Sequence, residues 1–212
     1  MYSIAIDGPA GSGKSTIAKA LANKLKIEYI DTGAMFRAIT LKLMENKDKS
    51  IPIEEILKNT TIAFQEGNIY LDGEDVSQKI RQEEVSNLTS DYSQIPEIRQ
   101  KLLSLQQEMA KTKNVVMEGR DIGTVVLPEA KYKFFLTACA KTRAKRRQLQ
   151  LQEKGMDVSF NQILADIKNR DSNDSKRKIA PLKQAEDAIR IDNSHLDHEQ
   201  TLHKILSYIK EG

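Results

Sequence analysis

Residues 8–15, Gly8-Pro9-Ala10-Gly11-Ser12-Gly13-Lys14-Ser15, have the types and spacing needed to bind nucleotide phosphates. The glycines let the backbone curl so that several N–H groups point at one anion. The ammonium group of Lys14 can bind the outer phosphates, and Ser15 can offer a hydroxyl oxygen to Mg²⁺. The segment is therefore a P-loop, which predicts a nucleoside triphosphate site. Its predicted residues are Gly8, Pro9, Ala10, Gly11, Ser12, Gly13, Lys14, Ser15 and Thr16.

Arginines are the next informative residues, because a guanidinium can bind a phosphate through two parallel hydrogen bonds. Arg37 and Arg120 follow predicted strands, at the sheet edge where open α/β proteins bind ligands. Arg99 lies on a predicted helix. Three more side chains are spaced so that they can share one helical face: Arg170, Asp174 and Arg177. Each alone could be a solvated surface residue, but together they favour a second anion near the P-loop.

Residues 141–147 form a basic cluster on another predicted helix. A solvated helix face is the default interpretation, and a nucleic-acid patch is conceivable. A third interpretation places Arg143, Arg146 and Arg147 on one face that closes over the bound phosphates as a lid. The sequence pattern alone leaves these alternatives open.

Apolar patterning predicts an α/β fold for the 212-residue chain. Short buried runs alternate with helical periodicity, which favours a P-loop NTPase-type parallel five-stranded sheet flanked by helices. The middle of the chain instead predicts an antiparallel hairpin, residues 60–65 with 68–72, with turns at Glu66-Gly67 and Asp72-Gly73. The predicted strands of the main sheet span residues 2–7, 27–31, 114–118, 131–136 and 188–192.

One domain is expected at this length, comprising a core, an insertion and a lid. We assign residues 1–48, 110–140 and 178–212 to the core, residues 49–109 to the insertion with its small antiparallel sheet, and residues 141–177 to the lid region.

Composition bounds the possible partners and compartment. A net charge of +3 is too small to indicate nucleic-acid binding by itself, and charges interrupt every apolar run, so no membrane span is expected. A single cysteine, Cys139, indicates a reducing compartment, and the start of the chain lacks a secretory signal pattern. We therefore expect a cytoplasmic protein without nucleic-acid or membrane partners, and patterning favours a monomer. Cys139 itself is expected to be a small buried packing residue.

The chain resembles bacterial cytidylate kinases, which are P-loop nucleoside monophosphate kinases. The P-loop carries part of this resemblance, and the stretch from Glu118-Gly119-Arg120-Asp121 to Val126 is more specific. Residues 31–37, 146–155 and 170–182 also match the family pattern, so the resemblance spans nearly the whole chain. Two positions depart from common family residues, Thr32 for Ser and Glu118 for Asp.

The resemblance implies an enzyme that transfers the γ-phosphoryl group of ATP to CMP or dCMP with Mg²⁺ as cofactor, and it implies that residues 49–109 are a monophosphate-binding subdomain. It implies that Arg37, Arg120 and Arg177 grip the acceptor phosphate with Thr32 close by. Arg170 and Asp174 would meet the ribose, and Ser90, Arg99 and Asp121 would recognise the cytosine. The catalytic set is Lys14, Arg37, Arg120, Arg146, Arg147 and Arg177.

The acceptor oxygen of a nucleoside monophosphate is largely ionised at neutral pH, so such a reaction needs no general base. Catalysis would consist of alignment and charge neutralisation. Alternatives of the same class are P-loop kinases for UMP, AMP, shikimate or dephospho-coenzyme A. A different class is a non-catalytic nucleotide switch or nucleic-acid-binding module that uses residues 141–147. The three histidines, His195, His198 and His203, favour a solvated helix over a metal cluster.

Overall fold

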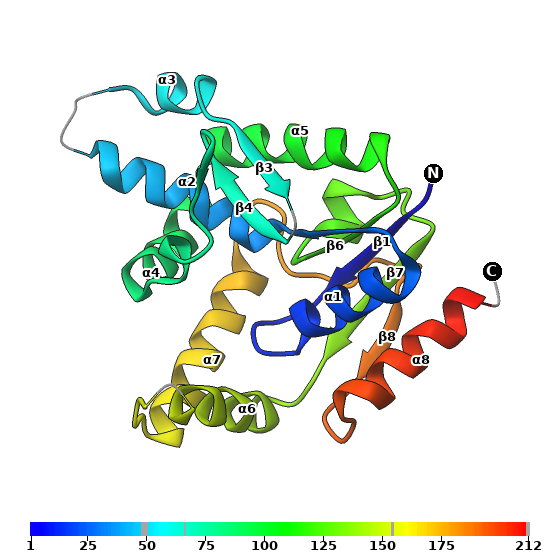
Figure 1. Cartoon of the computed structure of the whole chain (residues 1–212). Helices are drawn as coiled ribbons and strands as arrows, with labels where there is room; N and C mark the ends of the chain where they lie inside the picture. Colours follow the sequence, from blue (N-terminus) through cyan, green and yellow to red (C-terminus); the bar gives the residue numbers. More distant parts are fainter. Residues whose placement is uncertain (48–50, 66, 154, 211–212) are drawn as a thin grey trace. The chain divides into compact units, whose positions relative to one another are not determined.

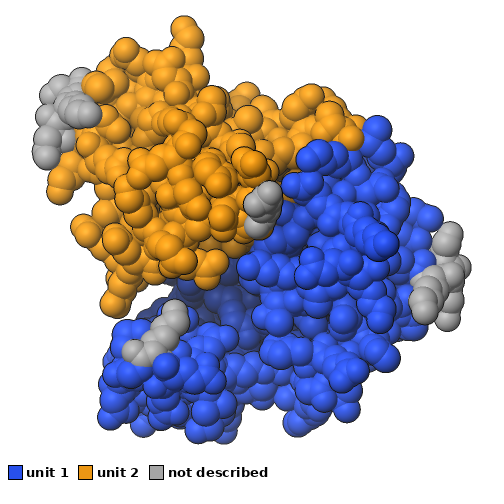
Figure 2. All heavy atoms as spheres, viewed as in Figure 1, with its two compact units in different colours: residues 1–29, 113–212 blue, residues 30–112 orange. Residues whose placement is uncertain are grey.

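The computed structural model describes residues 1–47, 51–65, 67–153 and 155–210. The chain divides into two compact units (Figure 2). Unit 1 comprises residues 1–29 and 113–212, and unit 2 comprises residues 30–112.

The main sheet has five strands in the order β2-β6-β1-β7-β8. Strands β6, β1, β7 and β8 are labelled in Figure 1. Parallel pairing joins β6 to β1, β1 to β7 and β7 to β8, and the first of these pairs runs from Ser3 opposite Val115 to Asp7 opposite Gly119. This confirms the predicted parallel five-stranded sheet. The strands span Ser3–Asp7 (β1), Glu28–Asp31 (β2), Val115–Gly119 (β6), Tyr132–Thr137 (β7) and Ile189–Asp192 (β8).

Four helices complete unit 1. Helices α1 (Lys14–Leu25) and α8 (His198–Lys210) share one apolar cluster with the strands, in which Ile17, Phe134 and Ile205 are buried. Helices α6 (Ala140–Gln152) and α7 (Phe160–Lys176) pack on each other through a smaller cluster of Ala144, Ile163 and Ile167. A short π-helical turn, Ile122–Val126, follows β6; the sequence analysis did not predict it.

Unit 2 combines helices with a small antiparallel sheet. Its helices are α2 (Thr32–Asn46), α3 (Ile53–Lys58), α4 (Glu83–Tyr92) and α5 (Pro96–Thr112), and a short 3₁₀ turn spans Lys79–Arg81. The predicted hairpin is confirmed as β3 (Ile62–Gln65) paired with β4 (Asn68–Leu71). A third strand, β5 (Glu74–Asp75), was not predicted and pairs with β4.

The predicted division into core, insertion and lid stays a prediction. Its insertion begins at Lys49, and one of its turns begins at Glu66; both residues lie outside the described part of the chain, as does Lys154 in the lid region. Within residues 1–47, 51–65, 67–153 and 155–210, no helix has the length and apolarity needed to span a bilayer.

Gly8 offers a direct test of how closely the P-loop fits the sheet. A Cβ atom at Gly8, where φ is 152°, would lie 2.0 Å from the backbone oxygen of Leu136. Since a backbone atom cannot yield as a side chain can, we expect Gly8→Ala to lower the free energy of unfolding by about 3 kcal/mol or more, measured by urea denaturation.

Gly73→Ala is the matched control, because Gly73 also has a positive φ of 87° but has open space around its Cβ direction. Backbone strain alone should cost about 1–2 kcal/mol there. Equal losses in the two variants would contradict a steric role for Gly8.

Candidate active site

The P-loop runs from the end of β1 into helix α1. Its glycines adopt positive φ values of 152° at Gly8, 73° at Gly11 and 89° at Gly13, which only glycine accommodates readily. Gly13 is the N-cap of α1 and supplies no side-chain cap, so the helix presents its positive end to the loop. The hydroxyl of Ser12 is buried and has no hydrogen-bond partner in the described part of the chain. This geometry is that of an anion-binding loop.

Lys14 is almost completely buried at the start of α1, and its Nζ donates to the backbone oxygen of Pro9 at 2.8 Å. Burial lowers the pKa of this ammonium, and the positive charge of Arg120 lowers it further. The carboxylates of Glu118 and Asp7 act in the opposite direction. Lys14 is thus a cation held in an unfavourable environment, which a bound polyanion would relieve.

Asp7, the last residue of β1, connects the P-loop strand to the segment that follows Arg120. One carboxylate oxygen accepts from the backbone N–H of Ile122 at 2.8 Å, and the other accepts from Gly123 at 2.7 Å. Burial raises the pKa of Asp7 to about 6, although these two hydrogen bonds oppose the shift. Asp7 was not among the predicted site residues; its place at a strand end, just before the P-loop, was the available signal.

Unit 1 brings together several of the predicted acceptor residues in two ion pairs. Arg120 Nε donates to Asp174 Oδ2 at 2.8 Å, and Arg177 Nη2 lies 3.3 Å from Asp121 Oδ1. Both members of the second pair are 8% exposed at the side chain. Each guanidinium is therefore paired with a carboxylate, which orients it.

The predicted common helical face of Arg170, Asp174 and Arg177 is only partly correct. The first two lie on α7, but the helix ends at Lys176 and Arg177 adopts an extended backbone conformation. Its Nε donates to the backbone oxygen of Ala180, so a turn positions Arg177. Arg170 is exposed, yet its charge contributes to lowering the pKa of Lys14.

The three arginines of the basic helix α6 differ in their exposure and in their partners. Arg147 is exposed, whereas Arg143 is buried and bonded to protein groups, so these residues do not form one free phosphate-binding face. Arg146 donates to the side chain of Asn193 at 3.2 Å and to its backbone oxygen at 2.8 Å. Asn193 is buried and donates in turn to Ser12 of the P-loop at 3.0 Å. The sequence analysis missed this role of Asn193.

Unit 2 holds the remaining predicted acceptor residues. Arg37 on α2 pairs with Asp31, the N-cap of that helix, at 3.1 Å, and Thr32 is buried at the first helical position. Arg99 on α5 lies over the ring of Phe36, 5.5 Å from its centroid. The structure describes these residues within unit 2.

Ser93 connects two of the predicted base-recognition residues in unit 2. Arg99 Nη1 donates to the backbone oxygen of Ser93 at 3.1 Å, while the Ser93 hydroxyl donates to the backbone oxygen of Ser90 at 2.9 Å. Arg99 and Ser90 are therefore neighbours, as a shared role would require.

The expectation that Cys139 is buried is wrong. Cys139 is exposed at the N-cap of α6, because the chain leaves the sheet before this residue. A hydrogen bond with the hydroxyl of Thr142 lowers the pKa of its thiol. His195, His198 and His203 are exposed, and no group of three potential metal ligands occurs among the described side chains.

Comparison with known proteins identifies the family. The family profile described as cytidylate kinase matches residues 4–211. The chain belongs to the cytidylate kinase family. A cytidylate kinase from Caldicellulosiruptor saccharolyticus is 55% identical over 210 residues, covering 96% of this chain and 93% of the relative. A cytidylate kinase from Clostridium botulinum is 50% identical over 211 residues, covering 98% and 97%.

Solved structures support the same fold at low sequence identity. Shikimate kinase from Bacteroides thetaiotaomicron has a TM-score of 0.51 at 15% identity, covering 99% of this chain and 98% of that one. A gluconokinase from Sinorhizobium meliloti has a TM-score of 0.50 at 13% identity, covering 99% and 92%. The fold is thus a P-loop kinase fold, and the cytidylate kinase assignment depends on the closer sequence relatives.

The lowered pKa of Lys14 predicts proton uptake on nucleotide binding. Phosphates favour the ammonium form, so they should raise this pKa again. At pH values between the pKa of Lys14 in the free protein and its pKa in the complex, nucleotide binding takes up protons. The affinity for the nucleotide therefore falls as the pH rises through this range. Calorimetric titration with ATP at about pH 8, in two buffers of different ionisation enthalpy, measures this uptake.

Lys24→Met is the control, because Lys24 is an exposed lysine in the last turn of α1. We expect the control to keep the proton uptake and Lys14→Met to lose it. Equal uptake in Lys14→Met and the unmodified protein would assign the protons to another group.

Proposed function

We propose that the protein catalyses transfer of the γ-phosphoryl group of ATP to CMP or dCMP, giving ADP and CDP or dCDP. Membership of the cytidylate kinase family over residues 4–211 is the observation that carries this proposal. The pairing of guanidinium groups with carboxylates beside the P-loop lysine supports it, because the reaction requires positive charge around two polyanions.

For the donor, we propose that residues 8–16 bind the phosphates of ATP, with Lys14 at the outer phosphates. The exposed hydroxyl of Ser15, in the first turn of α1, fits the preference of Mg²⁺ for oxygen ligands, and the nucleotide phosphates would complete its coordination. Mg²⁺ would supply neutralisation of phosphate charge. Arg146 and Arg147 would add positive charge from α6.

For the acceptor, we propose that Arg37, Arg120 and Arg177 bind the phosphate, with Thr32 adding a hydroxyl. A dianionic phosphate can replace a carboxylate as the partner of each guanidinium, so these guanidinium groups are already oriented when the substrate binds. Arg170 and Asp174 would contact the ribose. The same exchange would free Asp174 from Arg120 as the nucleotide arrives.

For the base, we propose recognition by Ser90, Arg99 and Asp121. A carboxylate accepts from the exocyclic amine of cytosine, and a guanidinium donates to its ring and carbonyl acceptors. Uracil would present an oxygen to Asp121 and leave a buried carboxylate facing an acceptor.

We also propose that the enzyme acts as a cytoplasmic monomer without nucleic-acid or membrane partners.

A panel of acceptors tests this function. ADP release, measured by a coupled assay with CMP, dCMP, UMP, AMP, shikimate and no acceptor, should be fastest with CMP or dCMP and should stop when EDTA removes Mg²⁺. Faster turnover of shikimate or AMP would favour another P-loop kinase. Salt-dependent binding to nucleic acid with no acceptor-dependent turnover would favour the binding-module alternative.

Asp121→Ala tests base recognition. We expect the ratio of kcat/KM for CMP to that for UMP to narrow by about tenfold or more, since the mismatch with uracil costs about 1–3 kcal/mol. Asp166→Ala is the control, because Asp166 is an exposed carboxylate on α7 whose hydrogen-bond partner within the described part of the chain is Gln162. An unchanged ratio in Asp121→Ala would remove Asp121 from this role.

A further inference from the structure

Arg143 holds together two parts of unit 1 that the proposed reaction must align. We propose that Arg143 is a positioning residue, which joins the P-loop to helix α7 through one guanidinium so that the two move together during phosphoryl transfer. The inference rests on the proposed function for its catalytic consequence, but its effect on nucleotide binding can be measured separately.

The guanidinium of Arg143 bonds to three separate segments. Nε donates to the backbone oxygen of Ala138 at 2.9 Å, at the end of the sheet. Nη1 donates to the backbone oxygen of Ala10 in the P-loop at 2.9 Å. Nη1 and Nη2 also donate to the two carboxylate oxygens of Asp171 on α7, at 2.9 and 2.5 Å.

These contacts leave Arg143 unsuited to binding a phosphate directly. Its side chain is 5% exposed, and four of its five N–H donors are engaged by the bonds just described. A Cβ atom added at Gly11 would contact the Cβ of Arg143 at 3.4 Å, so the arginine stem also packs directly on the P-loop. Its position therefore sets that of the loop.

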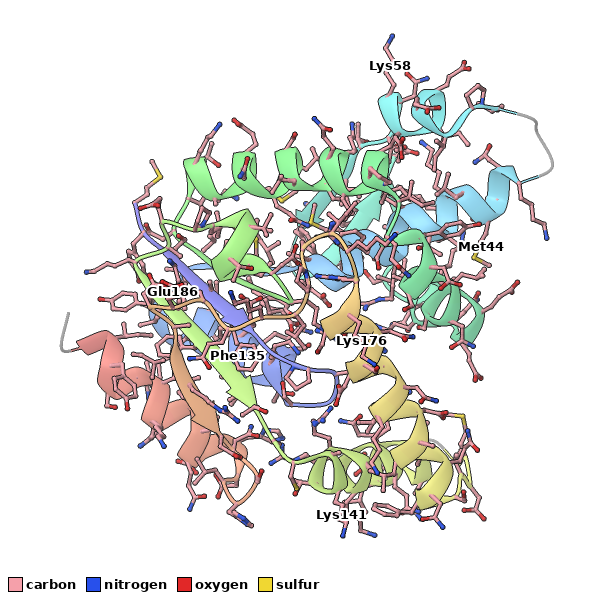
Figure 3. All side chains as sticks on the ribbon, turned by 180° about the vertical axis from the view of Figure 1, so that it is seen from behind. Met44, Lys58, Phe135, Lys141, Lys176 and Glu186 are labelled. Carbon is pink, nitrogen blue, oxygen red and sulfur yellow. The ribbon has the colours of Figure 1, made fainter. Side chains whose placement is uncertain are left out.

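On the other side, α7 connects Arg143 to the proposed acceptor residues. Asp171 directly follows Arg170 on α7, and Asp174 lies one turn later. The carboxylate of Asp174 accepts a hydrogen bond from Arg120. Figure 3 labels Lys141, near the start of α6, and Lys176, at the end of α7. These are the two helices that the pair of Arg143 and Asp171 joins. A chain of contacts thus runs from Ala10 to Arg120.

A lysine cannot reproduce this arrangement, because a point ammonium lacks the planar fork that bonds to Asp171 while also reaching two carbonyl oxygens. Arg143→Lys should therefore disturb both the P-loop and α7. Asp171→Asn should disturb only the α7 side, because it leaves the bonds to Ala10 and Ala138 intact.

The test compares nucleotide binding and turnover in the two variants. For Arg143→Lys we expect the Kd of a non-hydrolysable ATP analogue, measured without acceptor, to rise about tenfold and kcat with CMP to fall about tenfold. For Asp171→Asn we expect a Kd within about twofold of the unmodified protein and a similar tenfold fall in kcat. The double variant should lose no more turnover than Arg143→Lys, because both residues act through one contact.

Lys145→Met is the matched control, since Lys145 is an exposed cation on the same helix whose hydrogen-bond partner among the described residues is Gln148. Thermal melts establish the folded fraction of each variant, and rates are compared per folded molecule. Unchanged Kd and kcat in folded Arg143→Lys and Asp171→Asn would overturn the proposal, as would losses that only follow the folded fraction.

Failure of the proposed function gives a different result. In that case the unmodified protein would not phosphorylate CMP, while the effect of Arg143→Lys on the Kd of the ATP analogue would still test the contact with Ala10. An unchanged Kd there would overturn the positioning role independently of the acceptor.

Discussion

The controlling constraint on the proposed reaction is that several cations must lie close together to receive two polyanions. Burial lowers the pKa of Lys14, and the like charge of Arg120 lowers it further, so holding these cations together has a cost. The fold limits it by giving cations partners within the protein. Arg120 pairs with Asp174, Arg177 with Asp121, and Lys14 donates to the backbone oxygen of Pro9. In the proposed function, phosphate binding would be an exchange of partners for Arg120 and Arg177.

The same constraint explains why carboxylates occur in a site meant for anions. Asp7 is buried at the end of β1, where it accepts two backbone hydrogen bonds from the segment after Asp121. It therefore holds the segment after Asp121 in place and also opposes the effect of the positive charges around Lys14. An apolar residue in place of Asp7 would remove both effects. The two hydrogen bonds and the opposing charge therefore offset the cost of removing the Asp7 carboxylate from water.

Much of the fold could be predicted because its signals are local. Ile4, Ala5 and Ile6 form a continuous apolar run, as a strand buried on both faces requires, and the periodic positions Ile17, Ala18 and Leu21 are all fully buried. The missed elements are short: α3 spans six residues and β5 two, too few for a period to emerge. The π-helical turn after Asp121 depends on its contacts with Asp7, far away in the sequence.

For the predicted site too, local sequence signals could be interpreted, but contacts between distant parts of the chain could not be predicted. Residue type and spacing identify the P-loop, because its chemistry is carried by consecutive residues. Spacing could not distinguish the buried Arg143 from the exposed Arg147, since both occur in one basic run and differ only in what the tertiary fold places around them. Nor could it show that Cys139 caps a helix and is exposed.

Arginines with different tasks therefore share one helix. Arg143 donates to Ala10, Ala138 and Asp171, Arg146 donates to the buried Asn193, which bonds to Ser12 of the P-loop, and Arg147 is exposed. A guanidinium can serve in any of these settings because it stays charged when buried and has five directional donors. The protein partners thus become fewer from Arg143 to Arg147, and only the first two bond to the P-loop or to a residue that contacts it.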